Sequence, residues 1–217
     1  TKTEGHRMEI DLKGFRNERG LLWPATDTEC AAVVFDTAVD LDHAMPHVKD
    51  RSLCVQAGGN CGVWPRWLAD RFDVVFTFEP DHLNFTALAA NTHDKPNVIR
   101  MQAALGHTPR MIGLEREAGN CGAHFVSGAG MVPTIRIDDL ALPSCGLICL
   151  DIEGAEIDAL KGAVKTIAAN KPVIVIEDKG LSERFGHKKG DAERWLAGAF
   201  GYTVTARPHR DVVLVCP

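Results

Sequence analysis

Short apolar runs alternate with amphipathic stretches along most of the chain, and this alternation predicts strands and helices in turn. Apolar runs of strand length occupy residues 53–55, 73–78, 97–101, 146–150 and 173–177. Runs this short are typical of buried strands. Stretches with helical spacing begin near Val63, at Asp81, at Ala155 and before Trp195. Two further strand candidates, 202–206 and 212–215, end the chain, and we predict one α/β domain around a mostly parallel sheet with a reversed last strand.

The helix predicted to follow the 146–150 strand has the clearest periodicity. Its apolar positions step by three and four along Ile157, Leu160, Val164 and Ile167, which predicts one continuous apolar stripe. The pair Lys171-Pro172 ends this helix. The helix over 81–91 begins at Asp81, which we interpret as its N-cap.

Three segments fall outside this regular pattern. Residues 1–50 are interpreted as an accessory segment with strands at 8–12 and 31–35 around a turn-rich stretch. The irregular region 102–137 predicts a small insertion of two or three antiparallel strands beside the main sheet. Residues 179–190 are polar and are interpreted as a mobile loop.

Residues 40–47, DLDHAMPH, gather two Asp and two His as a metal site would. Pro46 interrupts any helix that would place His43 and His47 on one face, so we interpret the stretch as a solvated connector.

Composition limits the class of protein and the cellular compartment that we expect. The 217 residues suit a single domain, and 45% hydrophobic with 24% charged residues is ordinary for a globular chain. No apolar run reaches the length of a membrane span and no signal-peptide pattern opens the sequence, so we expect a cytoplasmic protein. Seven cysteines without a C-x-x-C pair predict reduced thiols rather than a zinc ribbon or disulfide framework. The net charge of −5 argues against nucleic acid as a partner.

The stretch from 53 to 80 carries the first chemical signal. Gly58, Gly59 and Gly62 lie where a strand should end and a helix should begin, and Glu79 follows Gly59 by twenty positions. Glycines let the backbone approach a ligand closely, and an acid at the tip of the second strand can accept hydrogen bonds from both ribose hydroxyls. The unit therefore predicts a Rossmann-like site for a ligand that contains adenosine.

Acidic residues follow several of the predicted strands. They are Glu79, Asp138 or Asp139, Asp151 with Glu153, and Glu177. Because ligands of open parallel sheets bind beyond the carboxyl ends of the strands, these groups map to one site. They would suit a positively charged ligand, accept a proton, or hold a hydroxyl for attack. The alternative for Asp151 or Glu153 is an N-cap of the helix that starts near Ala155.

Several motifs in order resemble those of the FkbM-type S-adenosylmethionine-dependent methyltransferases. They are VQAGGNCG, FTFEP with Asn84 and Asn91 beyond it, AALG, IDDL, LICLDIEGAEIDALKGA and KPVIVIE, over about residues 53–177. The resemblance implies a class I methyltransferase fold, with a seven-stranded, mostly parallel α/β sheet that has one antiparallel member. It assigns 51–217 to the cofactor-binding catalytic core of a single domain, preceded by the accessory segment 1–50.

The resemblance also implies roles for individual residues. Gly58, Gly59, Asn60 and Gly62 would approach the methionine part of the cofactor, Glu79 with Pro80 would hold the ribose, and Gln102, Ala103 and Ala104 would lie near the adenine. Asp151 and Glu153 would border the methyl donor and acceptor. Gln56 stands where the family often has an acid, so its contact with the cofactor's amino group would be weaker or indirect. Cys61, Trp64 and Pro65 replace commoner small or aliphatic residues, and Trp64 would reshape the pocket.

A hydroxyl acceptor needs a base, and Asp151 is the first candidate, with His124 or His187 behind it. A divalent ion at Asp151 is not favoured, because no second ligand is fixed by spacing.

The expected reaction is O-methylation of a small molecule or glycan. Methylation of a protein or nucleic acid stays open, because the acceptor would be selected by the variable segments 1–50, 105–137 and 179–190. An NAD-dependent oxidoreductase would need G-x-G-x-x-G, and Asn60 departs from it. A non-catalytic binding module with this fold is a third possibility, supported by Gln56. The oligomeric state and the identity of the acceptor stay open.

Overall fold

A computed structural model describes residues 13–217 of the chain. The strand predicted at 8–12 lies outside the described residues. Among residues 13–217, the helices are all too short or too polar to cross a lipid bilayer.

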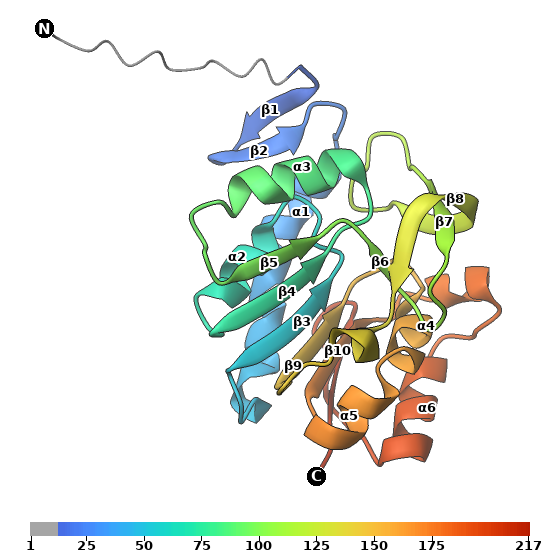
Figure 1. Cartoon of the computed structure of the whole chain (residues 1–217). Coiled ribbons are helices and arrows are strands. Elements are labelled where there is room, and N and C mark those ends of the chain that lie inside the picture. Colours follow the sequence, from blue (N-terminus) through green and yellow to red (C-terminus); the bar gives the residue numbers. More distant parts are fainter. Residues whose placement is uncertain (1–12) are drawn as a thin grey trace, which may run out of the picture.

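Seven strands form the central sheet (Figure 1). They are β3 (Leu53–Ala57), β4 (Val74–Phe78), β5 (Val98–Met101), β9 (Leu147–Leu150), β10 (Val173–Glu177), β11 (Thr203–Ala206) and β12 (Asp211–Val215). Their order is β11-β12-β10-β9-β3-β4-β5, and β12 runs antiparallel to both neighbours. The predicted mostly parallel sheet of seven strands with a reversed last strand is confirmed. Because the chain moves outward from β3 in one direction and from β9 in the other, the topological switch point lies between these two strands.

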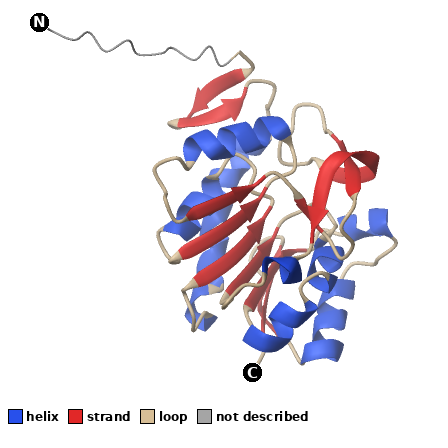
Figure 2. Cartoon of the chain, viewed as in Figure 1, coloured by secondary structure: helices blue, strands red, loops and turns tan. Residues whose placement is uncertain are grey.

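Helices cover both faces of this sheet (Figure 2). They are α1 (Cys30–Thr37), α2 (Val63–Ala69), α3 (His82–Asn91), α4 (Glu156–Lys161), α5 (Val164–Asn170) and α6 (Asp191–Phe200), with the 3-10 helices η1 (Ala38–His43), η2 (Met45–His47), η3 (Ile137–Leu140) and η4 (Leu181–Phe185). Alternate residues of each strand pack into separate cores. Ile148 and Ile174 lie in one core with Leu160 of α4, and their neighbours Cys149 and Val175 lie in the other. This period of two is what a sheet buried on both faces requires.

The helix predicted over 155–170 is two helices, and the reason is a close backbone approach. A Cβ at Gly162 would lie 2.3 Å from the carbonyl oxygen of Gly106, so the chain turns where the two backbones meet. Val164, predicted within the apolar stripe, is 41% exposed, whereas Ile157, Leu160 and Ile167 are buried. The single-stripe prediction was wrong at its centre.

The strand predicted at 31–35 is also wrong, since this run lies within α1. The carboxylate of Asp27 accepts hydrogen bonds from the backbone N–H groups of Cys30 and Ala31 at 3.1 and 3.0 Å, which satisfies donors at the start of the helix. The capping acid outweighs the strand preference of the valines. The Asp81 N-cap is confirmed, because its side chain accepts from Leu83 and Asn84.

Residues 40–47 form η1 and η2 rather than a solvated connector. Leu41 and Met45 are buried beneath the sheet, and the carboxylate of Asp40 contacts Nδ1 of His209 at 2.9 Å. The turn-rich stretch before them is a hairpin of β1 (Phe15–Glu18) and β2 (Leu21–Pro24). Asn91 of α3 holds this hairpin through two hydrogen bonds to the backbone of Leu22.

The insertion is a three-stranded sheet of β6 (Ala104–Leu105), β8 (Phe125–Ile135) and β7 (Met111–Glu115). Only the β7–β8 pair is antiparallel, because β6 pairs with β8 in parallel. β8 is a single strand of 11 residues that spans much of the second half of the predicted insertion. The polar loop 179–190 contains η4, and Lys179 at its start is held in ion pairs.

Candidate active site

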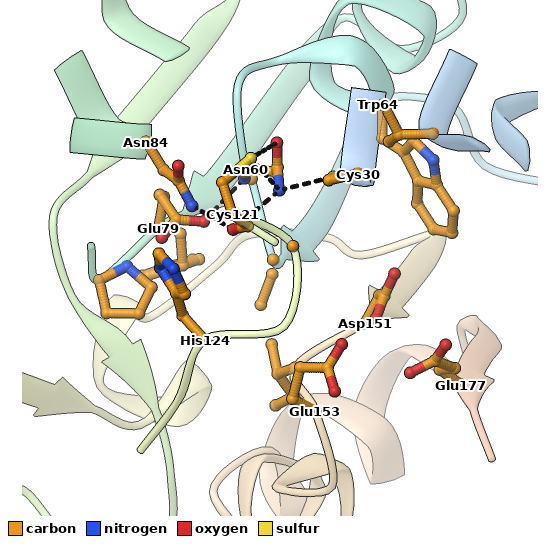
Figure 3. Close-up of a pocket in the computed structure, with 18 of the residues that line it drawn as sticks. Cys30, Asn60, Trp64, Glu79, Asn84, Cys121, His124, Asp151, Glu153 and Glu177 are labelled. Atoms are coloured by element: carbon orange, nitrogen blue, oxygen red, sulfur yellow. Dashed lines mark hydrogen bonds between the residues drawn. The ribbon is translucent and has the colours of Figure 1, made fainter. Parts of the chain in front are cut away.

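A cavity of about 340 Å³ opens at the carboxyl edge of the central sheet, beside the switch point. Its walls come from the ends of β3, β4, β9 and β10, from the start of β12, from α1 and from the loop before β8. Glu79, Asn60, Trp64 and Asp151 all line it, and Figure 3 shows Glu79 and Asn84 at one end and Asp151 with Glu177 at the other. We call these the Glu79 end and the acidic end.

The glycine turn after β3 is packed too tightly for any side chain. A Cβ at Gly58 would lie 1.9 Å from the carbonyl oxygen of Asp151, and Gly58 has a φ of +80°. A Cβ at Gly59 would lie 2.8 Å from Oγ1 of Thr77. Both glycines expose their backbone to the cavity, so the turn can approach a ligand as closely as the sequence predicts.

Glu79 is fixed at the tip of β4 by backbone donors. Its Oε2 accepts from the N–H of Asn60 at 2.7 Å, and its Oε1 accepts from the N–H of Asp81 at 2.8 Å. Burial raises the pKa of Glu79 to about 7, and these hydrogen bonds oppose that rise. The Asn84 side chain contacts the same carboxylate, and the lone pairs that remain can accept from a ligand.

Asn60 joins the turn to segments far away in the sequence. Its Nδ2 donates to the carbonyl oxygen of Cys121 at 3.4 Å and to Sγ of Cys30 at 3.5 Å. Asn84 donates to the same carbonyl at 2.7 Å. The contact with Cys121 and burial raise the pKa of the Cys30 thiol. The contact with Cys30 lowers the pKa of Cys121, but the contact with Cys61 and burial outweigh it, so both thiols stay protonated.

Cys30, Cys121 and Asp27 offer ligand atoms within 4.8 Å of one another. Asp27 already accepts four N–H donors, from Trp23, Cys30, Ala31 and Cys121. A metal there would have to displace part of this set, so we interpret the group as structural. No local pattern in the sequence indicates this group, because its members come from three separate segments.

Carboxylates dominate the acidic end. Asp151, Glu153 and Glu177 bring oxygens within 4.8 Å of one another, and Nζ of Lys179 lies 2.8 Å from both Glu153 and Glu177. Burial, followed by the charges of Glu177 and Glu153, raises the pKa of Asp151 well above its usual value. Three carboxylates could hold a divalent ion, but the ammonium of Lys179 already bridges two of them.

Two residues at this end have no role in the sequence predictions. Asp211 begins β12, where the reversed direction of that strand brings it to the carboxyl edge. Burial and the charge of Glu177 raise its pKa to about 7. Asp40 reaches the cavity from η1. The signal for Asp211 was present in the sequence, since the first residue of a reversed strand lies at the same edge as the last residues of its neighbours.

The two histidines proposed as bases lie in different places. His124 lines the cavity at the Glu79 end, and its Nδ1 lies 3.7 Å from Oδ2 of Asp81. Burial lowers the pKa of His124 below its usual value, which favours the neutral imidazole. His187 lies outside the cavity lining, with its Nδ1 4.0 Å from Asp191.

The structure separates the remaining predicted residues into two groups. Pro80, Ala103, Ala104 and Glu153 line the cavity. Gln56, Gly62 and Gln102 lie outside its lining.

Gln56 donates to the carbonyl oxygens of Ala57 and Gly58 at 3.1 and 2.9 Å and accepts from Thr77. Its amide is therefore committed to bracing the glycine turn.

The IDDL acids do not reach the cavity. Asp138 accepts hydrogen bonds from the backbone of Lys165 and Thr166 at the start of α5, and Asp139 pairs with Arg136 on the surface. Their assignment to the ligand site was wrong, because the strand before them, β8, belongs to the three-stranded insertion and not to the central sheet.

Comparisons with known proteins support the architecture. A family model described as the methyltransferase FkbM domain matches residues 57–204. No curated protein matches the chain. Among solved structures, the chain is similar to methyltransferase FkbM from Methylobacillus flagellatus KT, with 21% identity and a TM-score of 0.53. That match covers 76% of this chain and 43% of the other, so this chain spans less than half of that protein's length.

Two further structures share the fold over nearly their whole length. Precorrin-6y C5,15-methyltransferase from Geobacter metallireducens GS-15 is 12% identical, with a TM-score of 0.54 and coverage of 92% of this chain and 95% of the other. A putative methyltransferase from Streptococcus mutans in complex with SAH is 9% identical, with a TM-score of 0.51 and coverage of 82% and 95%. The seven-stranded order is thus that of class I methyltransferases. Since the family model spans most of the chain, the protein belongs to the FkbM family of S-adenosylmethionine-dependent methyltransferases.

Proposed function

We propose that this cavity binds S-adenosylmethionine and that the protein methylates a hydroxyl group of a small molecule or glycan. The observation that carries the proposal is the placement of Glu79 and Asp151 at opposite ends of one cavity, with the side-chain-free turn of Gly58 and Gly59 between them. S-adenosylmethionine would present its ribose diol to Glu79 and its positive charge to the acidic end. The turn between them carries no side chain and so leaves room for the cofactor.

The residues present fit this cofactor. Glu79 would accept hydrogen bonds from the ribose hydroxyls with its free lone pairs, and Ala103 with Ala104 would border the adenine. Gly58, Gly59 and Asn60 would lie along the amino-acid tail. Gln56 would act from beneath the turn, because its amide is committed to Thr77 and to the backbone.

Asp151 is the proposed base. When bound, S-adenosylmethionine supplies a methyl group on a sulfonium and leaves as the thioether. As the hydroxyl oxygen forms its bond to that methyl, Asp151 would take the hydroxyl proton. A raised pKa suits a base that must accept a proton near neutral pH, and a cation bound beside Asp151 would favour its ionised form. Glu153, held by Lys179, would orient the acceptor rather than take the proton.

His124 stays a proposed catalytic residue, though its contacts fit a different role. It lies beside Asp81, whose backbone N–H donates to Glu79. Because Glu79 would hold the ribose, His124 would border the nucleoside part of the cofactor. Its neutral imidazole would offer a hydrogen bond there without adding charge.

We further propose that 1–217 act as one catalytic unit in the cytoplasm. In support, Cys30, Val34 and Thr37 of α1 line the cavity together with the core, and the seven cysteines are all unpaired.

Calorimetry with S-adenosylmethionine, S-adenosylhomocysteine and NAD tests the cofactor. We expect both adenosyl compounds to bind and NAD to fail. Binding of NAD alone would overturn the assignment. Adenosyl binding without methyl transfer to any acceptor would instead favour the non-catalytic module.

A further inference from the structure

The carboxylate of Asp211 is buried in the cavity wall without a partner. The residue is 7% exposed and lines the cavity. Within residues 13–217, no hydrogen bond or ion pair reaches its side chain. A buried charge without a partner is costly, so its presence in a cavity points to a charge that a ligand supplies.

The neighbours of Asp211 increase this cost. Glu177 lies directly opposite it in the antiparallel register of β10 and β12, and like charges in that position repel. Two nearby cations are engaged elsewhere, and the exposed Arg210, which also lines the cavity, forms no ion pair with Asp211 in the described part of the chain. Lys179 lies 2.8 Å from both Glu177 and Glu153, and His209 contacts Asp40 at 2.9 Å. The Glu177–Asp211 pair therefore keeps an excess of negative charge.

The distance across the sheet assigns this charge to the acceptor rather than to the cofactor. Glu79 ends β4, and β3, β9 and β10 lie between β4 and β12. Four strand spacings place Asp211 roughly 19 Å from Glu79, whereas Asp151 at the end of β9 is roughly 10 Å away. A cofactor with its ribose at Glu79 has a tail of a few single bonds, which reaches toward Asp151 and ends short of β12.

A second buried group at this end also lacks a partner. Trp64 is 6% exposed, and its indole Nε1 has no hydrogen-bond acceptor in the described part of the chain. Trp64 lines the same cavity, and Figure 3 shows it on the side of Asn60 where Asp151 and Glu177 lie. The indole N–H can only donate, and its nitrogen is buried, so an acceptor atom of a ligand would reach it only where the ring turns toward the cavity.

We propose that the methyl acceptor is a small molecule carrying a protonated amine beside hydroxyl groups, an amino sugar or an amino alcohol, whose ammonium binds between Asp211 and Glu177. Trp64 donates to one of its oxygens, and a hydroxyl faces Asp151. This inference rests on the proposed methyl transfer and names the chemical class of its acceptor.

Thermal shift measurements on protein saturated with S-adenosylhomocysteine test the inference. The probes are glucosamine, galactosamine and 2-amino-1,3-propanediol, each beside its N-acetylated form, which keeps the hydroxyls and loses the charge. We expect at least one amine to raise Tm and to bind at least tenfold more tightly than its acetylated form. The responding amine separates the amino sugars from the amino alcohol.

The variant Asp211→Asn should lose this preference for the charged form while its affinity for S-adenosylhomocysteine stays within about twofold, which also shows that it folds. The matched control is Asp73→Asn, an exposed residue just before β4 at the opposite edge of the sheet, and it should behave as wild type. Trp64→Phe keeps the ring and removes the N–H, so it should weaken amine binding several-fold on its own.

Equal shifts with charged and acetylated probes, no shift with any amine, or a shift with magnesium or calcium chloride alone would overturn the inference. If S-adenosylhomocysteine itself fails to bind the wild-type protein, the proposed function fails first. If it binds and the amines do not, only the acceptor class is wrong.

Discussion

The two ends of the cavity hold their carboxylates in opposite ways. At the Glu79 end, both oxygens of Glu79 accept backbone N–H donors that the fold supplies. At the acidic end, Asp151 and Asp211 have no hydrogen bond or ion pair from any described residue. Glu79 is thus set in place before a ligand arrives, and the other two carboxylates depend on a ligand's charge. A preorganised end suits the proposed cofactor, and an uncompensated end suits the proposed acceptor.

The largest effect should come from the turn that joins the two ends. Gly58→Ala would place a Cβ 1.9 Å from the carbonyl oxygen of Asp151 at a φ of +80°. We expect the free energy of unfolding to fall by roughly 3–5 kcal/mol, measured by urea denaturation. Gly201→Ala is the matched control, because its φ of +76° is similar and no atom lies within 4 Å of the added Cβ. The control should lose only about 1 kcal/mol, and equal losses would show that the close approach does not matter.

Replacement of the proposed base should separate chemistry from cofactor binding. Asp151→Asn keeps the shape of the side chain and removes its ability to take a proton. We expect kcat to fall by about 100- to 10,000-fold, with the affinity for S-adenosylhomocysteine within about twofold. Asp139→Asn, which changes an exposed ion pair with Arg136, should leave both values unchanged. An Asp151→Asn variant with near wild-type turnover would show that the proton goes elsewhere.

The unpaired charge at the acidic end predicts an unusual pH dependence of stability. Folding raises the pKa of Asp211 from 3.8 to about 7, so the folded state binds the proton more tightly than the unfolded chain does. The contribution of Asp211 to the stability of the free protein therefore falls as pH rises from about 4 to 7.

Asp211→Asn removes this contribution, so its stability relative to wild type should increase between pH 5 and pH 8, by roughly 2–3 kcal/mol. His124, whose pKa is lowered, acts in the opposite direction in both proteins and cancels. Urea denaturation at pH 5, 6, 7 and 8 measures the difference, and parallel pH profiles would mean that Asp211 is not destabilised by its surroundings.

The strands and helices that short stretches of sequence determine were predicted correctly, and those that depend on distant contacts were not. The strand at 173–177 has the bounds of β10, because a continuous apolar run lies between Pro172 and the acid at its tip. The run at 31–35 was misassigned, because a carboxylate four residues before Ala31 decides its conformation. The break at Gly162 depends on a backbone contact with Gly106, which periodicity does not contain.

The residues of the candidate site also divide into those that local patterns predict and those that depend on distant contacts. Glu79 and Asp151 follow apolar runs directly, so strand-end reasoning brought them to one edge of the sheet. Trp64 was expected to shape the pocket, and it lines the cavity. Asp40 and the Cys30–Cys121 contact depend on how residues 13–50 pack against the core, and no local pattern contains that packing. The position of Asp211 follows from the reversed direction of β12. The reversed last strand was predicted, but Asp211 was not named as a residue of the site.

The central claim is that Glu79 holds the cofactor while the acidic end holds the acceptor. Calorimetric titration of S-adenosylhomocysteine into wild type, Glu79→Gln and Asp211→Asn tests it most directly. The amide of Glu79→Gln has no charge, and its NH₂ group would face a backbone N–H. We therefore expect this variant to bind S-adenosylhomocysteine at least tenfold more weakly, a loss of about 1.4 kcal/mol. The affinity of Asp211→Asn should stay within about twofold of wild type. An affinity of Glu79→Gln within experimental error of wild type, or an equal loss in both variants, would contradict the division of the cavity into two ends.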